Sequence, residues 1–137
     1  MSEQETDMDI ETIREQKLEK LRERAGKEAN QATPDDLVVV DSKTELSAFV
    51  DKHRLVVVDF HADWCGPCEM QEPILEALAA ERDVAVATVD VDRNQPLASA
   101  YDVRGIPALI IFADGEPVER LTGVQQRTTL DRLLDRY

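Results

Sequence analysis

Hydrophobic side chains recur in two distinct patterns along the chain after residue 34. Short, nearly continuous apolar runs, such as residues 55–60, are typical of strands that are buried on both faces of a sheet. Other stretches place apolar residues three and four positions apart, as an amphipathic helix does, for example at Leu46, Phe49 and Val50. The two patterns predict strands at residues 37–40, 55–60, 84–91, 108–112 and 118–122, and helices at residues 43–52, 66–82, 96–101 and 128–137.

The longest of these helices, at residues 66–82, is interrupted by Pro73, which we expect to kink it. Its predicted inward face consists of apolar residues at helical spacing: Met70, Ile74, Leu75, Leu78 and Ala79.

The order of the predicted elements, β-α-β-α-β-α-β-β-α, indicates an α/β fold. Helices that connect the early strands require parallel crossovers and cover both faces of the sheet. Asp114 and Gly115 separate the last two strands, and this pair favours the tight turn of an antiparallel hairpin. We therefore expect a central mixed sheet of about five strands flanked by helices.

Residues 1–33 lack strand-like runs and differ from the rest of the chain. Thr6 or Asp9 is suited to cap a helix that runs to Ala25 and ends at Gly26. Its apolar stripe is thin, which leaves open whether the helix docks on the domain, pairs with another chain or stays solvated. We expect an acidic N-terminal helical extension and linker at residues 1–33 and one domain at residues 34–137.

The charge balance is strongly acidic, with 29 acidic and 16 basic side chains and a net charge of −13. Residues 1–33 hold nine acidic and six basic groups, so the remaining 20 acidic and 10 basic groups give residues 34–137 a charge of −10. Such a surface argues against nucleic acid and anionic membranes as partners. Because the Debye length is about 3 Å in molar salt, an acid-rich, lysine-poor surface suits that environment and predicts a halophilic protein.

The chain ends and apolar runs indicate a soluble, cytoplasmic protein. The first five residues include two glutamates and contain no apolar core of a secretion signal. The longest apolar runs have the length of strands rather than of membrane helices. Two cysteines three positions apart do not form the disulfide framework of a secreted domain.

The chain's two cysteines, Cys65 and Cys68, lie in the sequence Trp-Cys-Gly-Pro-Cys between an apolar run and a predicted helix. At this spacing one helical turn lets the sulfurs bond reversibly, and the helix N-terminus stabilises a thiolate on the first of them. The alternative is a zinc site. Zinc needs four ligands, and the chain offers in addition only His53 and His61, at no recognised metal spacing. We therefore favour redox chemistry and expect no metal.

The residues around this motif closely resemble the thioredoxin family. The resemblance spans roughly residues 36–137 and rests on the run VDFHADWCGPC at residues 58–68, on Pro73, on VRGIPA at residues 103–108 and on Gly123. It implies the thioredoxin fold and a protein-disulfide reductase that is recycled by a thioredoxin reductase. It implies no cofactor beyond the redox-active disulfide of Cys65 and Cys68.

The resemblance also implies catalytic roles. Cys65 would be the nucleophile, nearer the solvent, and Cys68 would resolve the mixed disulfide. Asp59 would accept and donate the proton of Cys68, because an aspartate inside an apolar strand is costly to bury ionised and its pKa should rise. The alternative for Asp59 is a carboxylate at the strand end that reaches solvent.

A second set of residues would support the dithiol or bind substrate. The resemblance implies a cis peptide before Pro107, which would turn the backbone outward to pair with an extended substrate. Trp64 would shield the disulfide and offer a substrate surface, although a core position is its alternative. The predicted support residues are Trp64, Gly66 and Pro67, and the predicted substrate-binding residues are Ile106, Pro107, Gly105 and Gly123.

Three positions depart from the family. His61 and Glu69 replace the usual tryptophan and the usual basic residue, and we expect His61 to be partly exposed. Thr88 stands where a lysine usually pairs with the buried aspartate. Without that cation, the pKa of Asp59 should be higher still.

These observations predict a monomeric thiol-disulfide oxidoreductase whose partners are disulfide-containing proteins and a thioredoxin reductase. One alternative is a disulfide oxidant or isomerase with the same fold, against which the Gly-Pro between the cysteines argues. The other is a non-catalytic interaction module that binds a partner through the N-terminal helix. The intact cysteine pair argues against it.

Overall fold

A computed structural model describes residues 14–16 and 33–137 of the protein. The chain divides into two units, residues 1–32 and residues 33–137, and every element named below belongs to the second. The predicted N-terminal helix lies outside the described residues, apart from residues 14–16, which are helical and exposed.

The core of the unit is a sheet of five strands in the order β1-β3-β2-β4-β5. The strands β1, β3 and β2 run parallel, whereas β4 is antiparallel to β2 and β5 is antiparallel to β4. The predicted mixed sheet is therefore confirmed, and β2 lies at its centre. The strands are β1 (Val38–Val39), β2 (Leu55–His61), β3 (Ala85–Asp90), β4 (Ala108–Ala113) and β5 (Glu116–Thr122).

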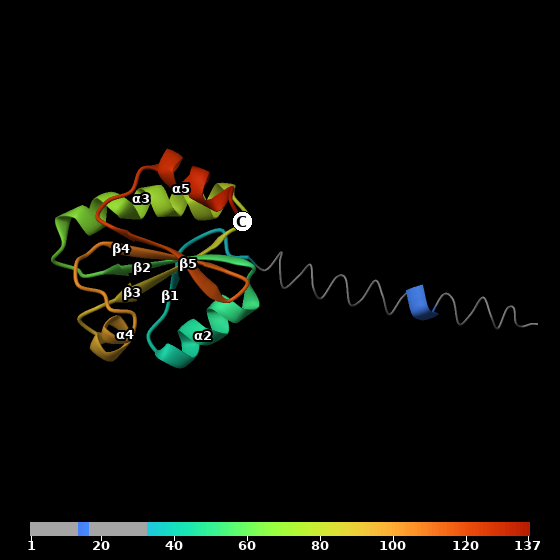
Figure 1. Ribbon diagram of the computed structural model, residues 1–137, viewed down its shortest axis with the longest axis horizontal. Coiled ribbons are helices and arrows are strands. Elements are labelled where there is room, and N and C mark those ends of the chain that lie inside the picture. The colour runs from blue at the N-terminus through green and yellow to red at the C-terminus, as the bar shows by residue number, and fades with distance from the viewer. Residues whose placement is uncertain (1–13, 17–32) are drawn as a thin grey trace, which may run out of the picture. The chain divides into compact units, whose positions relative to one another are not determined.

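Helices cover both faces of this sheet, as the crossover connections require (Figure 1). One face carries α3 and α5, and the opposite face carries α2 and α4. The helices are α2 (Lys43–Lys52), α3 (Gly66–Glu81), α4 (Gln95–Ala100) and α5 (Arg127–Leu134). None of the helices in residues 14–16 and 33–137 is long and apolar enough to span a bilayer.

The alternation of side chains along β2 divides the core between the two faces. Val56 and Val58 pack in the cluster that includes Leu46 of α2. Leu55 and Val57 pack in the opposite cluster, beneath α3 and α5. The residue that continues this second series is Asp59, so the strand places its carboxyl group under α3.

The turn between β4 and β5 is the predicted one. Asp114 and Gly115 have φ angles of 53° and 84°. Positive φ at both positions is what a tight hairpin turn requires, and aspartate and glycine tolerate it well.

The inward face of α3 differs from the prediction at one turn. Met70 is 65% exposed, so its predicted inward position is wrong, whereas the neighbouring Gln71 is fully buried. The reason is helical phase. Gln71 lies three positions after the buried Cys68, which places it on the same face of the helix, whereas Met70 lies only two positions after Cys68 and points away from that face. Gln71 donates a hydrogen bond to the carbonyl oxygen of Gln125 and accepts one from its N–H, at 3.1 and 2.6 Å. This pair of bonds ties α3 to the segment that leads into α5.

Candidate active site

Cys65 and Cys68 form a disulfide where the chain leaves the central strand and enters α3. Ala62 begins this connection, and its carbonyl oxygen accepts a hydrogen bond from the N–H of Cys65 at 3.2 Å. Cys65 is the N-cap of α3, and Pro67 lies in the first turn, where its missing N–H costs no helical bond. The chain thus places the dithiol at the positive end of a helix of 16 residues.

One backbone hydrogen bond distinguishes the two sulfurs. The N–H of Cys68 donates to the Sγ of Cys65 at 3.2 Å. A donor aimed at this sulfur, together with the helix dipole, stabilises negative charge on Cys65 when the disulfide is reduced. Exposure does not distinguish them, because the two residues are 4% and 5% exposed. The prediction that Cys65 lies nearer the solvent is therefore wrong for the disulfide form, in which both cysteines belong to a small buried cluster with Ala62 that packs against Val91 and Ile106.

Trp64 lies on the surface beside the disulfide. Its side chain is 71% exposed, which rules out the alternative of a core tryptophan. The indole Nε1 donates a hydrogen bond to Oδ2 of Asp92 at 2.8 Å. This partner, in the loop after β3, was not foreseen from the sequence. It fixes the ring at an exposed position where a large apolar face is free to contact another molecule.

The loop before β4 approaches the disulfide from another side. The peptide bond between Ile106 and Pro107 is cis. The carbonyl oxygen of Pro107 accepts a hydrogen bond from the N–H of Gly123 at 2.8 Å, and Gly123 has a φ of 90°. A Cβ at Gly105 would lie 3.3 Å from Cγ2 of Thr122, a tight contact. Gly105, Ile106, Pro107 and Gly123 are thus brought together at the start of β4 and the end of β5.

Gly66, between the cysteines, faces open space. A Cβ built at this position would meet no atom within 4 Å. The packing of the chain itself therefore does not require glycine at Gly66, which leaves room there for an approaching molecule.

Asp59 lies in the central strand, on the face that α3 covers. In register it is flanked by Thr88 on β3 and Leu109 on β4, so neither neighbouring strand places a cation beside it. The side chain is buried at 3% exposure, and its Oδ1 has no hydrogen-bond partner among the described residues. Burial, and secondarily the negative charge of Glu72, raises the pKa of Asp59 from 3.8 to about 7. The alternative of a solvated carboxylate is wrong.

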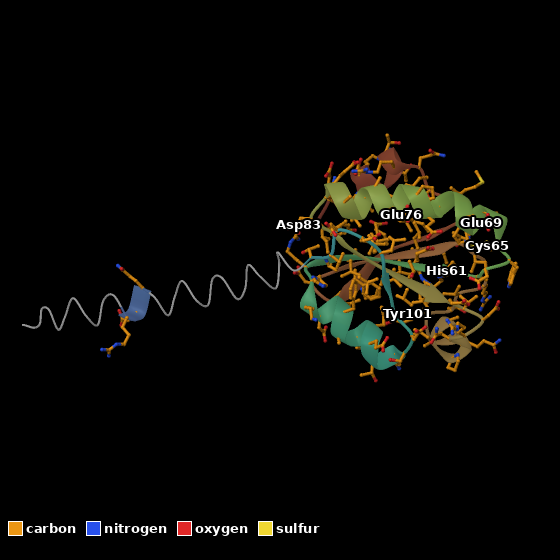
Figure 2. All side chains as sticks on the ribbon, turned by 180° about the vertical axis from the view of Figure 1, so that it is seen from behind. His61, Cys65, Glu69, Glu76, Asp83 and Tyr101 are labelled. Carbon is orange, nitrogen blue, oxygen red and sulfur yellow. A yellow bond between two sulfur atoms is a disulfide. The ribbon has the colours of Figure 1, made fainter. Side chains whose placement is uncertain are left out.

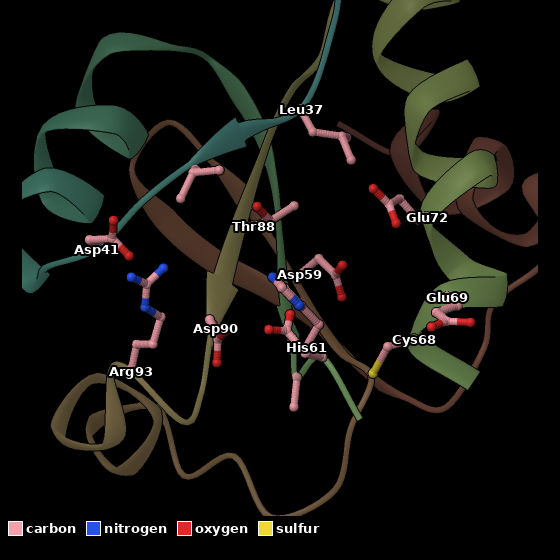
Figure 3. Close-up of a pocket in the computed structure, with 13 residues that line it drawn as sticks. Leu37, Asp41, Asp59, His61, Cys68, Glu69, Glu72, Thr88, Asp90 and Arg93 are labelled. Atoms are coloured by element: carbon pink, nitrogen blue, oxygen red, sulfur yellow. The ribbon is translucent and has the colours of Figure 1, made fainter. Parts of the chain in front are cut away.

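A pocket of about 410 Å³ connects Asp59 with Cys68 (Figure 3). The predicted residues His61, Glu69 and Thr88 also line it, and His61 is partly exposed. The pocket is strongly acidic, with Arg93 as the one lysine or arginine in its lining. Its carboxyl groups belong to Asp41, Asp59, Asp63, Glu69, Glu72 and Asp90. None of the residues predicted to bind substrate lines this pocket.

Glu72 is a site residue that the sequence analysis missed. It lines the pocket with Asp59 and follows Cys68 by four positions on α3. That spacing puts two residues on one face of a helix, and it was the signal that could have found Glu72. Figure 2 shows the helix that carries it, together with the labelled Cys65, Glu69 and Glu76.

The two histidines of the zinc alternative lie in different places: His61 lines the pocket with Cys68, whereas His53 does not. His53 is buried against Phe49, with ring centroids 5.0 Å apart, and lines a different cavity with Gly115. Within the described residues there is no group of three His, Cys, Asp or Glu side chains arranged to hold a metal ion. In the disulfide form, neither cysteine carries the thiolate charge that a zinc ligand needs.

A disulfide that closes one helical turn is a reversible two-electron store, and a buried acid that shares a pocket with its second cysteine can exchange protons with it. This fold and this site define a thiol-disulfide oxidoreductase.

Comparisons with known proteins identify the family. The family model described as Thioredoxin matches residues 37–136. A thioredoxin of Chlamydia trachomatis is 46% identical over 84 residues, which is 61% of this chain and 82% of the relative. A thioredoxin of Chlamydia pneumoniae is 40% identical over 102 residues, or 74% of this chain and 99% of the relative. Among solved structures, a mutant thioredoxin from Halobacterium salinarum superposes with a TM-score of 0.75 at 50% identity, covering 77% of this chain and 93% of that one.

The chain belongs to the thioredoxin family, and its activity is dithiol-disulfide exchange. The fold predicted from the resemblance, a thioredoxin fold with a mixed sheet of five strands, is confirmed.

The raised pKa of Asp59 predicts how stability depends on pH. Between about pH 4 and about pH 7, the folded protein holds a proton on Asp59 that the unfolded chain has released, so the free energy of unfolding falls as pH rises through this window. The full loss is roughly 4 kcal/mol. Asp59→Asn removes the titrating group. We expect the mutant to match the parent near pH 4 and to exceed its stability above pH 7, measured by urea unfolding from pH 4 to 8.

A matched control is Asp51→Asn, which changes an exposed aspartate outside the pocket. It should leave the difference between pH 4 and pH 8 unchanged. If Asp59→Asn and the parent protein gave parallel stability profiles over this range, Asp59 would not be the buried, protonated group described above.

Proposed function

We propose that the protein reduces disulfides in other proteins and is itself returned to the dithiol form by a thioredoxin reductase. The observation that carries this proposal is the disulfide at the N-terminus of α3, with a backbone N–H directed at Cys65. The matches to thioredoxins over most of residues 37–136 support the proposal that electrons pass from this protein to the substrate disulfide.

The first step of the reaction is the attack of the Cys65 thiolate on a substrate disulfide. The new bond joins Cys65 to one substrate sulfur, the substrate S–S bond breaks, and the other sulfur leaves as a thiolate that takes a proton from water. The N–H of Cys68 and the helix dipole support the Cys65 thiolate before attack.

Cys68 completes the reaction. Its thiol passes its proton to ionised Asp59 through the pocket they share, and the resulting thiolate attacks the Sγ of Cys65. The bond between Cys65 and the substrate breaks, and the second substrate sulfur leaves as a thiolate that takes a proton from water. The substrate has gained two electrons and two protons, and the Cys65–Cys68 disulfide has formed. A pKa of about 7 suits Asp59 to this exchange near neutral pH.

The residues around the exposed end of the site would bind the substrate. The cis Ile106–Pro107 peptide presents backbone close to the disulfide, and Ile106 packs against the cluster that contains the two cysteines. Gly105 and Gly123 flank this loop. Trp64 supplies an apolar face, and the open space at Gly66 lets a substrate sulfur approach.

The surface charge indicates where the protein works. We infer a cytoplasm with a high salt concentration, because residues 34–137 carry a charge of −10 and the chain is 50% identical to a thioredoxin from Halobacterium salinarum. In this setting the domain of residues 34–137 acts as a monomer and residues 1–33 are an extension with no part in the chemistry.

Replacement of each cysteine by serine should block the reaction at a different step. Cys65→Ser removes the nucleophile, so reduction of insulin by dithiothreitol should fall to the uncatalysed rate and no mixed disulfide should form. Cys68→Ser keeps the attack step but cannot release the substrate, so it should accumulate a mixed disulfide through Cys65, visible by mass spectrometry. Full catalytic turnover by either mutant would contradict the mechanism.

Salt should stabilise the protein in proportion to its surface charge. The Debye length falls from about 10 Å at 0.1 M salt to about 3 Å at 1 M, so the mutual repulsion of the acidic groups is screened and the melting temperature should rise steeply with KCl. The double mutant Glu76→Lys, Asp51→Lys, at two exposed positions, should flatten that rise. A melting temperature that did not respond to KCl would leave the acidic surface unrelated to salt.

A further inference from the structure

The buried carboxyl group of Asp59 has an unusual set of neighbours. Its Oδ1 has no hydrogen-bond partner within the part of the chain that the structure describes. The strand neighbours in register, Thr88 and Leu109, carry no charge. Burial therefore acts on Asp59 without a compensating cation or donor from the sheet, and the groups across the pocket decide how its charge is balanced.

The group that faces Asp59 from α3 is Glu72. It lies one helical turn beyond Cys68, is exposed to solvent, and lines the same pocket as Asp59 and Cys68. Figure 3 shows the carboxyl groups of Asp59 and Glu72 directed toward each other across the gap between β2 and α3. The interaction between them is repulsive, and it raises the pKa of Asp59 beyond the effect of burial.

The other ionisable groups around the pocket do not cancel this repulsion. They come from every element that borders it: His61 and Asp63 from the end of β2 and the turn after it, Cys68 and Glu69 from α3, Asp90 and Arg93 from β3 and the following loop, and Asp41 from the segment after β1. Arg93 is the one lysine or arginine in this lining.

We propose that Glu72 is a positioning residue for disulfide exchange: its carboxylate at the mouth of the pocket keeps Asp59 protonated up to neutral pH and so sets the pH above which Asp59 accepts the proton of Cys68. This inference rests on the proposed role of Asp59. In the step it controls, the S–H bond of Cys68 breaks and the proton passes to the Asp59 carboxylate. The Cys68 thiolate then forms the bond to Cys65 while the bond between Cys65 and the substrate sulfur breaks, and that sulfur leaves as a thiolate. Water in the pocket then takes the proton from Asp59, and the acidic mouth favours its departure as a cation.

The size of the effect follows from the placement of the two groups. The two carboxyl groups face each other across a pocket that is partly open to solvent. Removing the negative charge of Glu72 should therefore lower the pKa of Asp59 by about one unit at low salt. Since Glu72 is exposed, screening in molar KCl should reduce its influence, so the same substitution should matter less there.

The test compares Glu72→Gln with Glu76→Gln. Both remove one negative charge from exposed positions on α3, but Glu76 does not line the pocket. The Asp59 carboxyl is titrated by carbon NMR in the disulfide form. The release of substrate by Cys68 is followed in single turnovers from pH 5 to 9.

At 0.1 M salt, Glu72→Gln should lower the titration midpoint of Asp59 by about one pH unit and move the pH profile of release by the same amount, which makes release about fivefold faster near pH 6. Glu76→Gln should leave both readouts at parent values, and Glu72→Asp should restore most of the parent midpoint. In molar KCl the shift caused by Glu72→Gln should shrink.

An Asp59 midpoint in Glu72→Gln that stayed within about 0.3 units of the parent would overturn the proposal, while leaving the proposed function intact. A different result would remove the role of Asp59 itself. If Asp59→Asn released substrate with the parent pH profile, Asp59 would not be the acceptor, and Glu72 would lose its role in exchange whatever the NMR titration showed.

Discussion

The burial of one carboxyl group in the central strand is the constraint on which the site depends. Asp59 occupies the α3 face of β2, where Leu55 and Val57 belong to the core, and it is 3% exposed. A charge there is costly, so the group is held near its neutral form and its pKa reaches about 7. The same packing that buries Asp59 places it in one pocket with Cys68. Stability and the proposed proton exchange therefore depend on the same buried group, and rising pH favours the exchange while it lowers the stability.

A single helix, α3, organises the chemistry around that carboxyl group. Its N-terminus holds the disulfide and directs an N–H at Cys65. Its buried face carries Cys68, and Gln71 fixes the helix to the backbone at Gln125. Its second turn presents Glu72 to the pocket. Because these groups share one rigid element, their positions relative to Asp59 depend on how α3 packs on the sheet. The cis Ile106–Pro107 peptide, which we propose binds substrate, lies in a separate loop.

Local patterns predicted most of the fold, because apolar runs and helical spacing report directly which faces are buried. They located the elements of residues 37–137 to within a few residues, and an aspartate inside an apolar run indicated a buried acid. What they missed depends on tertiary placement. Met70 was assigned to the core because hydrophobicity does not fix helical phase, and Gln71 takes that position with backbone partners 54 residues away. The contact of Trp64 with Asp92 and the repulsion between Glu72 and Asp59 join separate elements, so no local pattern contains them.

The central claim is that the Cys65–Cys68 pair donates electrons to protein disulfides. The reduction potential of this pair, measured at equilibrium against a glutathione or dithiothreitol redox buffer, tests it most directly. We expect a strongly reducing potential near the value known for thioredoxins, about −270 mV. A potential between about −180 and −120 mV, the range of disulfide isomerases and oxidants, would contradict the account, because a pair so poised would accept electrons from the proteins it is proposed to reduce.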